Sequence, residues 1–425
     1  MASFWRTLAC SLVFGISYTA AHGGAGTGTE YPPLPLPSGV TASYVDTTNT
    51  SGLVFHYLSA GCDPSNTKPL VLILHGYPEI AYGFKDMLVP IAEQGYCVIA
   101  PDQRGYGRTT GWDMRPWAYV DLKQWKFENL VRDLMAFVWA IGYTEVKCVV
   151  GHDFGTIPAG WAALTRPDIF HSVVHMSVPF VPPASIPFNL TSTPTPPAAL
   201  STADWTYADV EYALEHLTPP RKNYQWYNSQ PSAAQDFLNP TALNNSLHAF
   251  FRVEWYLKSP AYLAQFPPPH ELASSDPAQL AQVPYFYVPL ANQTISEALA
   301  ALYVGQNASP SEAWFPDADV DVYVQEYTRT GFQGALNYYR VLTSPPGPLT
   351  DDGILWAGRK ITVPTFFLGG KYDWQTYLVH GALENYNQTS TDFRGSVLLN
   401  GSGHWPYIEQ TGETVKYVNE FLASL

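Results

Sequence analysis

The chain has 425 residues, enough for one large domain or two, and 46% of them are hydrophobic. Its formal net charge is −14 and it has no basic run, which argues against nucleic acid or an anionic membrane surface as a partner. Only 14% of the residues are charged, while Trp, Tyr and Pro are abundant, a composition that favours a compact protein with an aromatic pocket.

Residues 1–21 have the pattern of a secretory signal peptide. Arg6 supplies a positive charge, residues 8–16 are apolar, and residues 19–21 are small enough for cleavage. The apolar stretch is too short for a membrane span. The chain also contains seven Asn-x-Ser/Thr sequons, which mark acceptor sites for N-glycans. They begin at Asn49, Asn189, Asn244, Asn292, Asn307, Asn387 and Asn400. We therefore expect a secreted glycoprotein.

Residues 22–40 are rich first in Gly and then in Pro, as in a linker or a strap over the core. Three cysteines follow the signal: Cys62, Cys97 and Cys148. At most one disulfide can form among them, so at least one stays free. Cys97 and Cys148 lie in apolar, strand-like runs and are expected to be buried thiols. No Cys/His spacing predicts a metal site.

The first motif that bears on function comes after an apolar run at residues 70–74. Such a run is typical of a parallel strand that is buried on both faces. It leads into His-Gly-Tyr-Pro-Glu at residues 75–79, where the backbone N–H of Tyr77 can face a pocket. An ordinary turn at a strand end would have the same composition. The motif gains weight because it precedes a second strand-end motif in the chain.

This second motif ends a valine-rich run with Gly-His-Asp-Phe-Gly at residues 151–155 and passes into a predicted helix at 156–166. Gly-x-Asp-x-Gly between a strand and a helix predicts a nucleophile elbow, a tight turn that presents its central side chain to a pocket. Asp153 is that residue. The N–H of Phe154, together with that of Tyr77, would form an oxyanion hole. The simpler alternative is that Asp153 only caps the helix.

An Asp nucleophile limits the classes of substrate that the enzyme can attack. A carboxylate that attacked an ester would give an anhydride, whereas one that attacks an sp3 carbon gives an ester that water can open. Asp153 therefore favours epoxides or alkyl halides as substrates.

Two later strand ends supply the remaining catalytic groups. An apolar run at residues 361–368 precedes Asp373, and a run at 396–399 precedes His404. Open α/β sheets form their sites at the carboxyl ends of the strands. The order nucleophile, acid, histidine is that of a hydrolase triad, with Asp373 supporting His404 as the general base.

Alternating strand and helix signals at residues 41–180 and 346–425 predict the core, a doubly wound, mostly parallel sheet. A proline-rich break after Pro179 opens a segment at 181–345 that ends near Pro345 and Pro346. We expect this segment to be an inserted, mainly helical cap.

With these motifs the chain resembles the epoxide hydrolases of the α/β-hydrolase fold, of the soluble, cap-bearing type, and in particular a secreted, fungal-like member. The matching motifs are His-Gly-Tyr-Pro-Glu, Gly-His-Asp-Phe-Gly, Gly-His-Trp at residues 403–405, Asp-Gln-Arg-Gly-Tyr-Gly-Arg-Thr at 102–109 and Gly-Phe-Gln-Gly-Ala-Leu-Asn-Tyr-Tyr-Arg at 331–340. The chain has Phe154 where the family more often has Trp, and Tyr77 where Phe is common. Both still offer a backbone N–H.

The resemblance implies hydrolysis of an epoxide by water to a vicinal diol, without a cofactor. It also implies two cap tyrosines that hold the epoxide oxygen. One maps onto Tyr339, and Tyr256 is our candidate for the other. Alternatives for the second position are Trp255, Tyr262, Tyr285 and Tyr287, because the chain has 28 tyrosines and few of them can be catalytic.

Two other functions fit the same fold. A haloalkane dehalogenase would use the same Asp–His–acid chemistry, but it needs side chains that stabilise a halide, and Phe154 and Tyr77 are poor halide donors. A secreted binding protein without catalysis is the other alternative, although every triad position is filled. The oligomeric state is left open by the sequence.

Overall fold

The computed structural model describes residues 31–183, 206–274, 276–344 and 351–425. The expected signal peptide, most of the Gly-rich stretch, Asn189 and the Pro345–Pro346 end of the cap lie outside these ranges. Residues 31–35, the described end of an N-terminal segment, have no regular structure. Leu36–Leu425 form one compact unit, which contains every helix and strand of the described chain.

Eight strands form a single sheet in the order β1-β2-β4-β3-β5-β6-β7-β8. Their bounds are β1 Val40–Thr47, β2 Leu53–Ala60, β3 Leu70–Leu74, β4 Cys97–Pro101, β5 Cys148–His152, β6 Val173–Met176, β7 Thr365–Gly370 and β8 Phe393–Leu399. Only the pairings of β1 with β2 and of β2 with β4 are antiparallel. The mostly parallel sheet confirms the expected fold class.

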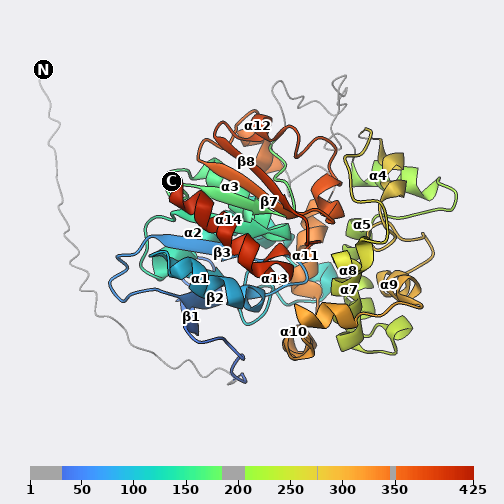
Figure 1. The fold of residues 1–425 in the computed structure, drawn as a ribbon, viewed down its shortest axis with the longest axis horizontal. Coiled ribbons are helices and arrows are strands. Elements are labelled where there is room, and N and C mark those ends of the chain that lie inside the picture. The colour runs from blue at the N-terminus through green and yellow to red at the C-terminus, as the bar shows by residue number, and fades with distance from the viewer. Residues whose placement is uncertain (1–30, 184–205, 275, 345–350) are drawn as a thin grey trace, which may run out of the picture. The chain divides into compact units, whose positions relative to one another are not determined.

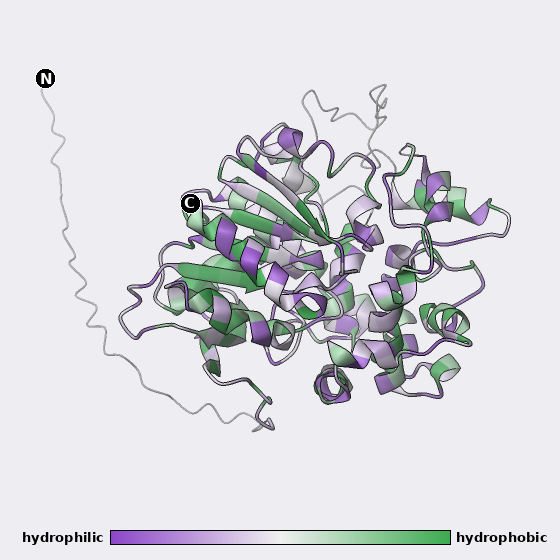
Figure 2. Ribbon diagram, in the orientation of Figure 1, coloured by the Kyte–Doolittle hydropathy of each residue, from purple (hydrophilic) through white to green (hydrophobic). Residues whose placement is uncertain are grey.

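The inner strands are apolar because both of their faces are covered. Every residue of β3, β4, β5, β6 and β7 is buried, whereas in the edge strand β1 only the two end residues are buried and the six between them are exposed or half-buried. In Figure 2 the central strands are hydrophobic, and the helices around them have mixed hydropathy.

The helices of the core follow the strands that they cover. They are α1 Lys85–Ala92, α2 Phe127–Ala140, α3 Thr156–Thr165, α12 Tyr386–Thr389, α13 Pro406–Glu409 and α14 Thr411–Ala423. Helix α2 contacts α3, and α1 contacts α14, which lies beside it in Figure 1.

Between β6 and β7 the described residues form helices and no strand of the sheet. These cap helices are α4 Tyr207–Glu215, α5 Tyr224–Asn228, α6 Ala233–Leu238, α7 Leu247–Leu257, α8 Pro260–Leu263, α9 Ile295–Tyr303, α10 Asp317–Thr330 and α11 Gln333–Leu342. Figure 1 shows α4, α5, α7, α8 and α9 together on one side of the sheet. The helical character agrees with expectation, but the expected limits at 181 and 345 adjoin residues outside the described ranges. No helix in the described parts of the chain combines the length and hydropathy needed to cross a membrane.

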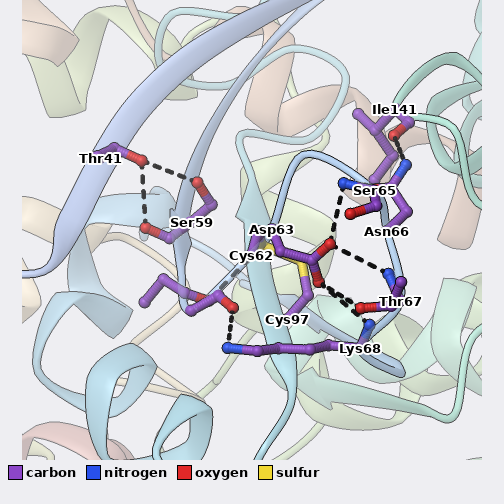
Figure 3. The surroundings of a disulfide bond; sticks show 12 residues. Thr41, Ser59, Cys62, Asp63, Ser65, Asn66, Thr67, Lys68, Cys97 and Ile141 are labelled. Carbon is purple, nitrogen blue, oxygen red and sulfur yellow. Dashed lines mark hydrogen bonds between the residues drawn. A yellow bond between two sulfur atoms is a disulfide. The ribbon is translucent and has the colours of Figure 1, made fainter.

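A disulfide joins Cys62 and Cys97 (Figure 3). It links the loop after β2 to the first residue of β4, and Cys148 in β5 remains a buried free thiol. The expectation that Cys97 is a free thiol was therefore wrong. A strand-like run hides this pairing because Cys97 begins its strand and so lies at the strand end, where the loop carrying Cys62 passes. Beside the disulfide, Asp63 accepts hydrogen bonds from the backbone N–H groups of Ser65, Thr67 and Lys68, which fixes the loop.

Candidate active site

The chain makes a sharp turn at Asp153, between β5 and α3. The backbone of Asp153 has φ +49°, a left-handed conformation that is uncommon for a residue other than glycine. A Cβ atom on Gly155 would overlap the carbonyl oxygen of Leu74 in β3. Glycine is therefore required for the turn to approach the neighbouring strand. This geometry is that of the expected elbow, and it presents the carboxylate at the carboxyl end of the sheet.

Asp153, His404 and Asp373 lie together. His404 Nε2 is 3.6 Å from Asp153 Oδ2, and His404 Nδ1 is 2.9 Å from Asp373 Oδ2. All three side chains are at most 10% exposed. Asp373 also accepts a hydrogen bond on Oδ1 from the backbone N–H of Gln375, at 2.9 Å, so both of its oxygens have partners. The imidazole is thus held between two carboxylates.

These contacts shift the pKa values of the buried groups. Burial favours the neutral form of each, but the two neighbouring carboxylates outweigh that cost and raise the pKa of His404. Conversely, the pKa of Asp153 is lowered, because its contact with His404 and the backbone N–H of Tyr77 outweigh its burial. At neutral pH Asp153 is therefore an anion, as a nucleophile must be, and His404 beside it is the positively charged imidazolium.

The backbone N–H of Tyr77 donates to Asp153 Oδ1 at 2.8 Å. A Cβ atom on Gly76 would overlap the Asp153 side chain, so the glycine of the His-Gly motif leaves room for the nucleophile. Phe154, the second expected oxyanion-hole residue, follows Asp153 in the short 3₁₀ turn Asp153–Gly155. The structure thus brings both backbone groups to the same end of the sheet.

Behind the nucleophile lies a buried polar network. Glu79 accepts hydrogen bonds from the N–H of Gly76 at 2.8 Å and from the indole of Trp405, and its Oε2 is 2.9 Å from His152 Nδ1. The other ring nitrogen of His152 is 2.7 Å from the carbonyl oxygen of His404. Glu79 and His152 thereby tie the Tyr77 loop to the backbone of the His404 loop.

The same group is the one place in the described ranges where three potential metal ligands converge. Ligand atoms of Glu79, His152 and His404 lie within 4.8 Å of one another. Both ring nitrogens of His152 already have hydrogen-bond partners, and His404 Nδ1 is bonded to Asp373. The donors are committed to each other, so these residues do not fit a metal site.

A cavity of about 410 Å³ adjoins Asp153. Its walls are mostly apolar, and the core side includes Phe154, Trp161 and Phe180, while the cap side includes Val210, Leu280 and Val288. The few polar groups that reach it include Tyr224, Tyr287 and Gln375. An apolar chamber with a carboxylate at one end suits a neutral organic substrate.

The structure brings Tyr339 to the site. Its ring lies 4.5 Å from that of Phe154 and 5.3 Å from that of Tyr77, between centroids. A second cap tyrosine, Tyr224 at the start of α5, lines the cavity, with its ring centroid 5.9 Å from that of Tyr339. Burial and the negative charge of Asp153 raise the pKa of both phenols, so both are neutral proton donors at pH 7.

The structure does not bring Tyr256 to the cavity. Its hydroxyl donates to Gln306 Oε1 at 3.2 Å, and its ring contacts those of Tyr262 and Tyr303. Tyr256 therefore lies on a face of α7 that points away from the cavity. Helical side chains point in all directions, and the sequence of α7 does not show which of its faces meets the core.

The four alternatives to Tyr256 have different positions. Trp255 stacks between Phe315 and Trp405, at centroid distances of 5.0 and 4.6 Å. Tyr262 packs on Tyr256, and Tyr285 is 38% exposed beneath the Arg221 guanidinium. Only Tyr287 lines the cavity, with its ring 5.1 Å from that of Tyr224.

Sequence reasoning missed Tyr224 and gave no role to Glu79 or Gln375. Tyr224 sits in Asn223-Tyr224-Gln225, which has no motif that separates it from the other tyrosines. The position of Glu79, directly after His-Gly-x-Pro at the end of a buried strand, could have indicated a role. A buried carboxylate needs hydrogen-bond partners, so an acid at this place predicts a polar network.

Known proteins share this fold. The sequence profile of the alpha/beta hydrolase fold family matches residues 69–411. The chain belongs to this family. A solved structure of an epoxide hydrolase from an endophytic Streptomyces superposes with a TM-score of 0.68 over 91% of this chain and 96% of that one, at 24% identity. Potato epoxide hydrolase I superposes with a TM-score of 0.64, also at 24% identity, over 91% of this chain and 100% of its own.

Comparison with curated relatives identifies a group within the fold family to which the chain is similar. Epoxide hydrolase B of Mycobacterium tuberculosis is 30% identical over 383 residues, which cover 89% of this chain and 97% of that protein. Epoxide hydrolase 3 of Siraitia grosvenorii is 30% identical over 350 residues, covering 80% and 83%. Within the fold family, the chain therefore groups with the epoxide hydrolases.

Proposed function

We propose that the protein hydrolyses an epoxide to a vicinal diol through a covalent ester on Asp153. The observation that carries this proposal is a buried carboxylate at the elbow, bonded to the Tyr77 N–H and in contact with His404. A carboxylate in this position attacks carbon, and the ester that it forms stays beside the base that removes it. Members of the same family that are named epoxide hydrolases support the assignment.

In the first step Asp153 attacks an epoxide carbon from the core side of the cavity. A bond forms between the carboxylate oxygen and carbon while the carbon–oxygen bond of the ring breaks. The released oxygen needs a proton, because an unprotonated alkoxide is a poor leaving group. We assign its donors as Tyr339 and Tyr224, which takes the place of Tyr256 in the pair. The support is that both rings lie near Asp153 and near each other.

Once the ester has formed, His404 gives its extra proton to the phenolate that the first step produced. In the second step the neutral imidazole removes a proton from water, and that water attacks the carbonyl carbon of the ester. Asp373 keeps the imidazole oriented through its bond to Nδ1. The N–H groups of Tyr77 and Phe154 stabilise the oxyanion, each such donor being worth roughly 3 kcal/mol. Collapse of the intermediate releases the diol, whose departing oxygen takes a proton from His404. The second water proton, left on the Asp153 carboxyl, then passes to His404, so that the free enzyme again has an anionic Asp153 and a protonated His404.

Heavy-oxygen water distinguishes this route from direct attack of water on the epoxide. One turnover with excess enzyme should leave the diol unlabelled and put the label into the peptide that contains Asp153. In a His404→Gln variant the ester should accumulate, with a mass increase equal to one epoxide on residues 151–156. Label found only in the diol would contradict the proposal. Release of halide from an alkyl halide, without diol from any epoxide, would favour a haloalkane dehalogenase, and inactivity on both substrate classes would favour a binding protein.

We also propose that the protein is secreted and N-glycosylated. The signal pattern at residues 1–21 supports this, as do the exposed side chains of all six sequon asparagines in the described ranges. The Cys62–Cys97 disulfide adds support, because disulfides persist in oxidising compartments. Peptide mapping of protein from the culture medium of a eukaryotic host should find an N-terminus near Ala21 or His22 and glycans on several sequons. Retained Met1 with every sequon unmodified would refute this proposal.

A further inference from the structure

The hydroxyl oxygen of Tyr224 accepts hydrogen bonds from two side-chain amides. Gln375 Nε2 donates to Tyr224 Oη at 2.7 Å, and Gln225 Nε2 donates to the same oxygen at 3.1 Å. A phenol oxygen accepts at most two hydrogen bonds and donates one. With both acceptor positions filled by amides, the one remaining direction belongs to the hydroxyl proton.

Both amides are themselves held in place. Tyr207 Oη donates to Gln225 Oε1 at 2.7 Å, which leaves the nitrogen of that amide facing Tyr224. Gln375 is 6% exposed, and its backbone N–H is bonded to Asp373 Oδ1. Tyr224, Gln225 and Gln375 all line the cavity beside Asp153.

We propose that Gln375 and Gln225 are positioning residues, which hold the Tyr224 hydroxyl so that its proton points into the cavity toward the epoxide oxygen. This inference rests on the proposed function. The two amides have a second effect on the same step, because they are donors to the oxygen that becomes negative when the phenol gives up its proton. They therefore stabilise the phenolate formed as the carbon–oxygen bond of the ring breaks.

The electrostatic surroundings agree with this role. Burial raises the pKa of Tyr224, as do the charge of Asp153 and the nearby Tyr207, whereas the hydrogen bonds from Gln375 and Gln225 lower it. The other titratable groups that face its ring are Tyr287 and Tyr339. The amides are thus the groups in contact with Tyr224 that favour release of its proton.

Gln375 also connects the two halves of the reaction. Its backbone N–H holds Asp373, the acid that supports the base of the second step, and its side chain holds the proton donor of the first. The residue comes from the short 3₁₀ turn Trp374–Tyr377 after β7, whereas Tyr224 comes from cap helix α5. The bond between them therefore sets the position of the cap donor relative to the core.

The test is Gln375→Glu, which keeps the shape of the side chain and replaces its amide donor with a carboxylate that accepts. Where this Glu is ionised it takes the Tyr224 proton away from the cavity. Ring opening, followed as epoxide consumption by excess enzyme in a single turnover, should slow by about tenfold to a hundredfold. As the pH is lowered and the Glu becomes protonated, it can donate again and the rate should recover toward that of the wild type. Gln375→Met, which neither donates nor accepts, should slow ring opening less than Glu and without that recovery.

Two controls separate positioning from a general effect of the substitution. Gln94→Glu adds the same charge at an exposed site after α1 and should leave ring opening unchanged. In a Tyr224→Phe background Gln375→Glu should slow ring opening little further, because the group through which it acts is gone.

The inference is overturned if Gln375→Glu opens the epoxide at the wild-type rate at every pH, or if it is equally harmful without the Tyr224 hydroxyl. Should Gln375→Glu fail to fold, a wild-type rate in Gln375→Met would overturn it as well. Failure of the wild type and of Gln94→Glu to form any diol would instead refute the proposed function.

Discussion

The core and the cap, the two walls of the site, hold their functional groups in different ways. On the core side, Asp153, Asp373 and Tyr77 each follow the end of a buried parallel strand, and main-chain geometry fixes them. On the cap side, Tyr224 and Tyr339 come from separate helices, α5 and α11. Their rings pack near each other, and two side-chain hydrogen bonds hold the hydroxyl of Tyr224. Under the proposed mechanism, the groups at the ends of the strands perform the chemistry, while the cap tyrosines position the epoxide oxygen.

The largest effect is expected at the core wall. Asp153→Asn should reduce diol formation by about 10⁴-fold or more, because an amide cannot form the ester. Asn tolerates the left-handed backbone at this turn, so the fold should be retained. Circular dichroism and the turnover rate measure the two properties. Substantial diol formation by freshly prepared Asp153→Asn would show that the elbow carboxylate is not the nucleophile.

The next effect is expected at Asp373, whose charge matters most once His404 becomes positive. Asp373→Asn should slow hydrolysis of the ester by about 10²-fold to 10⁴-fold and its formation much less, so the ester accumulates. Mass spectrometry of the quenched enzyme would detect it. Wild-type turnover in this variant would mean that the supporting acid lies elsewhere.

A smaller effect is expected at the cap wall, because two phenols share one task. Tyr224→Phe and Tyr339→Phe should each slow ring opening by about tenfold to a thousandfold, with the double variant slower than either. Tyr256→Phe removes a hydroxyl that faces Gln306 and should leave the rate unchanged. If Tyr256→Phe is slow and Tyr224→Phe is not, the assignment of the second tyrosine is reversed.

Removal of the disulfide, which joins the loop after β2 to the start of β4, is expected to have no effect on turnover. A double variant with Cys62→Ser and Cys97→Ser should keep its kinetic constants while its free energy of unfolding falls by about 4 kcal/mol, given the sequence separation of 35 residues. Denaturant titration measures that loss. Unchanged stability would show that the bond adds nothing to the fold, and a large loss of turnover would show that it supports the site.

The difference between the walls also explains how far the sequence could predict them. Strand-end motifs are local, so a valine-rich run followed by Gly-x-Asp-x-Gly already implies that Asp153 is presented at the edge of a parallel sheet. The same logic led to Tyr77, Asp373 and His404, which the structure brings together.

The cap offers no such pattern. Whether Tyr224 or Tyr256 reaches the cavity depends on how short helices pack against one another, which is set by contacts far apart in sequence. Tyr339 could be located because it follows a family motif, and Gln375 could not, because its partner comes from α5, about 150 residues earlier in the chain. The pairing of Cys62 with Cys97 was hidden for a similar reason.

The placement of one imidazole between two carboxylates has a consequence for the order of events. In the free enzyme both Asp153 and Asp373 are negative, and together they keep His404 protonated, so it cannot accept a proton from water. In the proposed mechanism Asp153 loses its charge when it becomes an ester, and His404 then has one anionic neighbour instead of two. The pKa of His404 then falls, its extra proton passes to the phenolate left by the first step, and the base becomes available only after the ester exists. In this mechanism, formation of the intermediate makes available the base that removes it, and before the ester forms the base is inactive toward water.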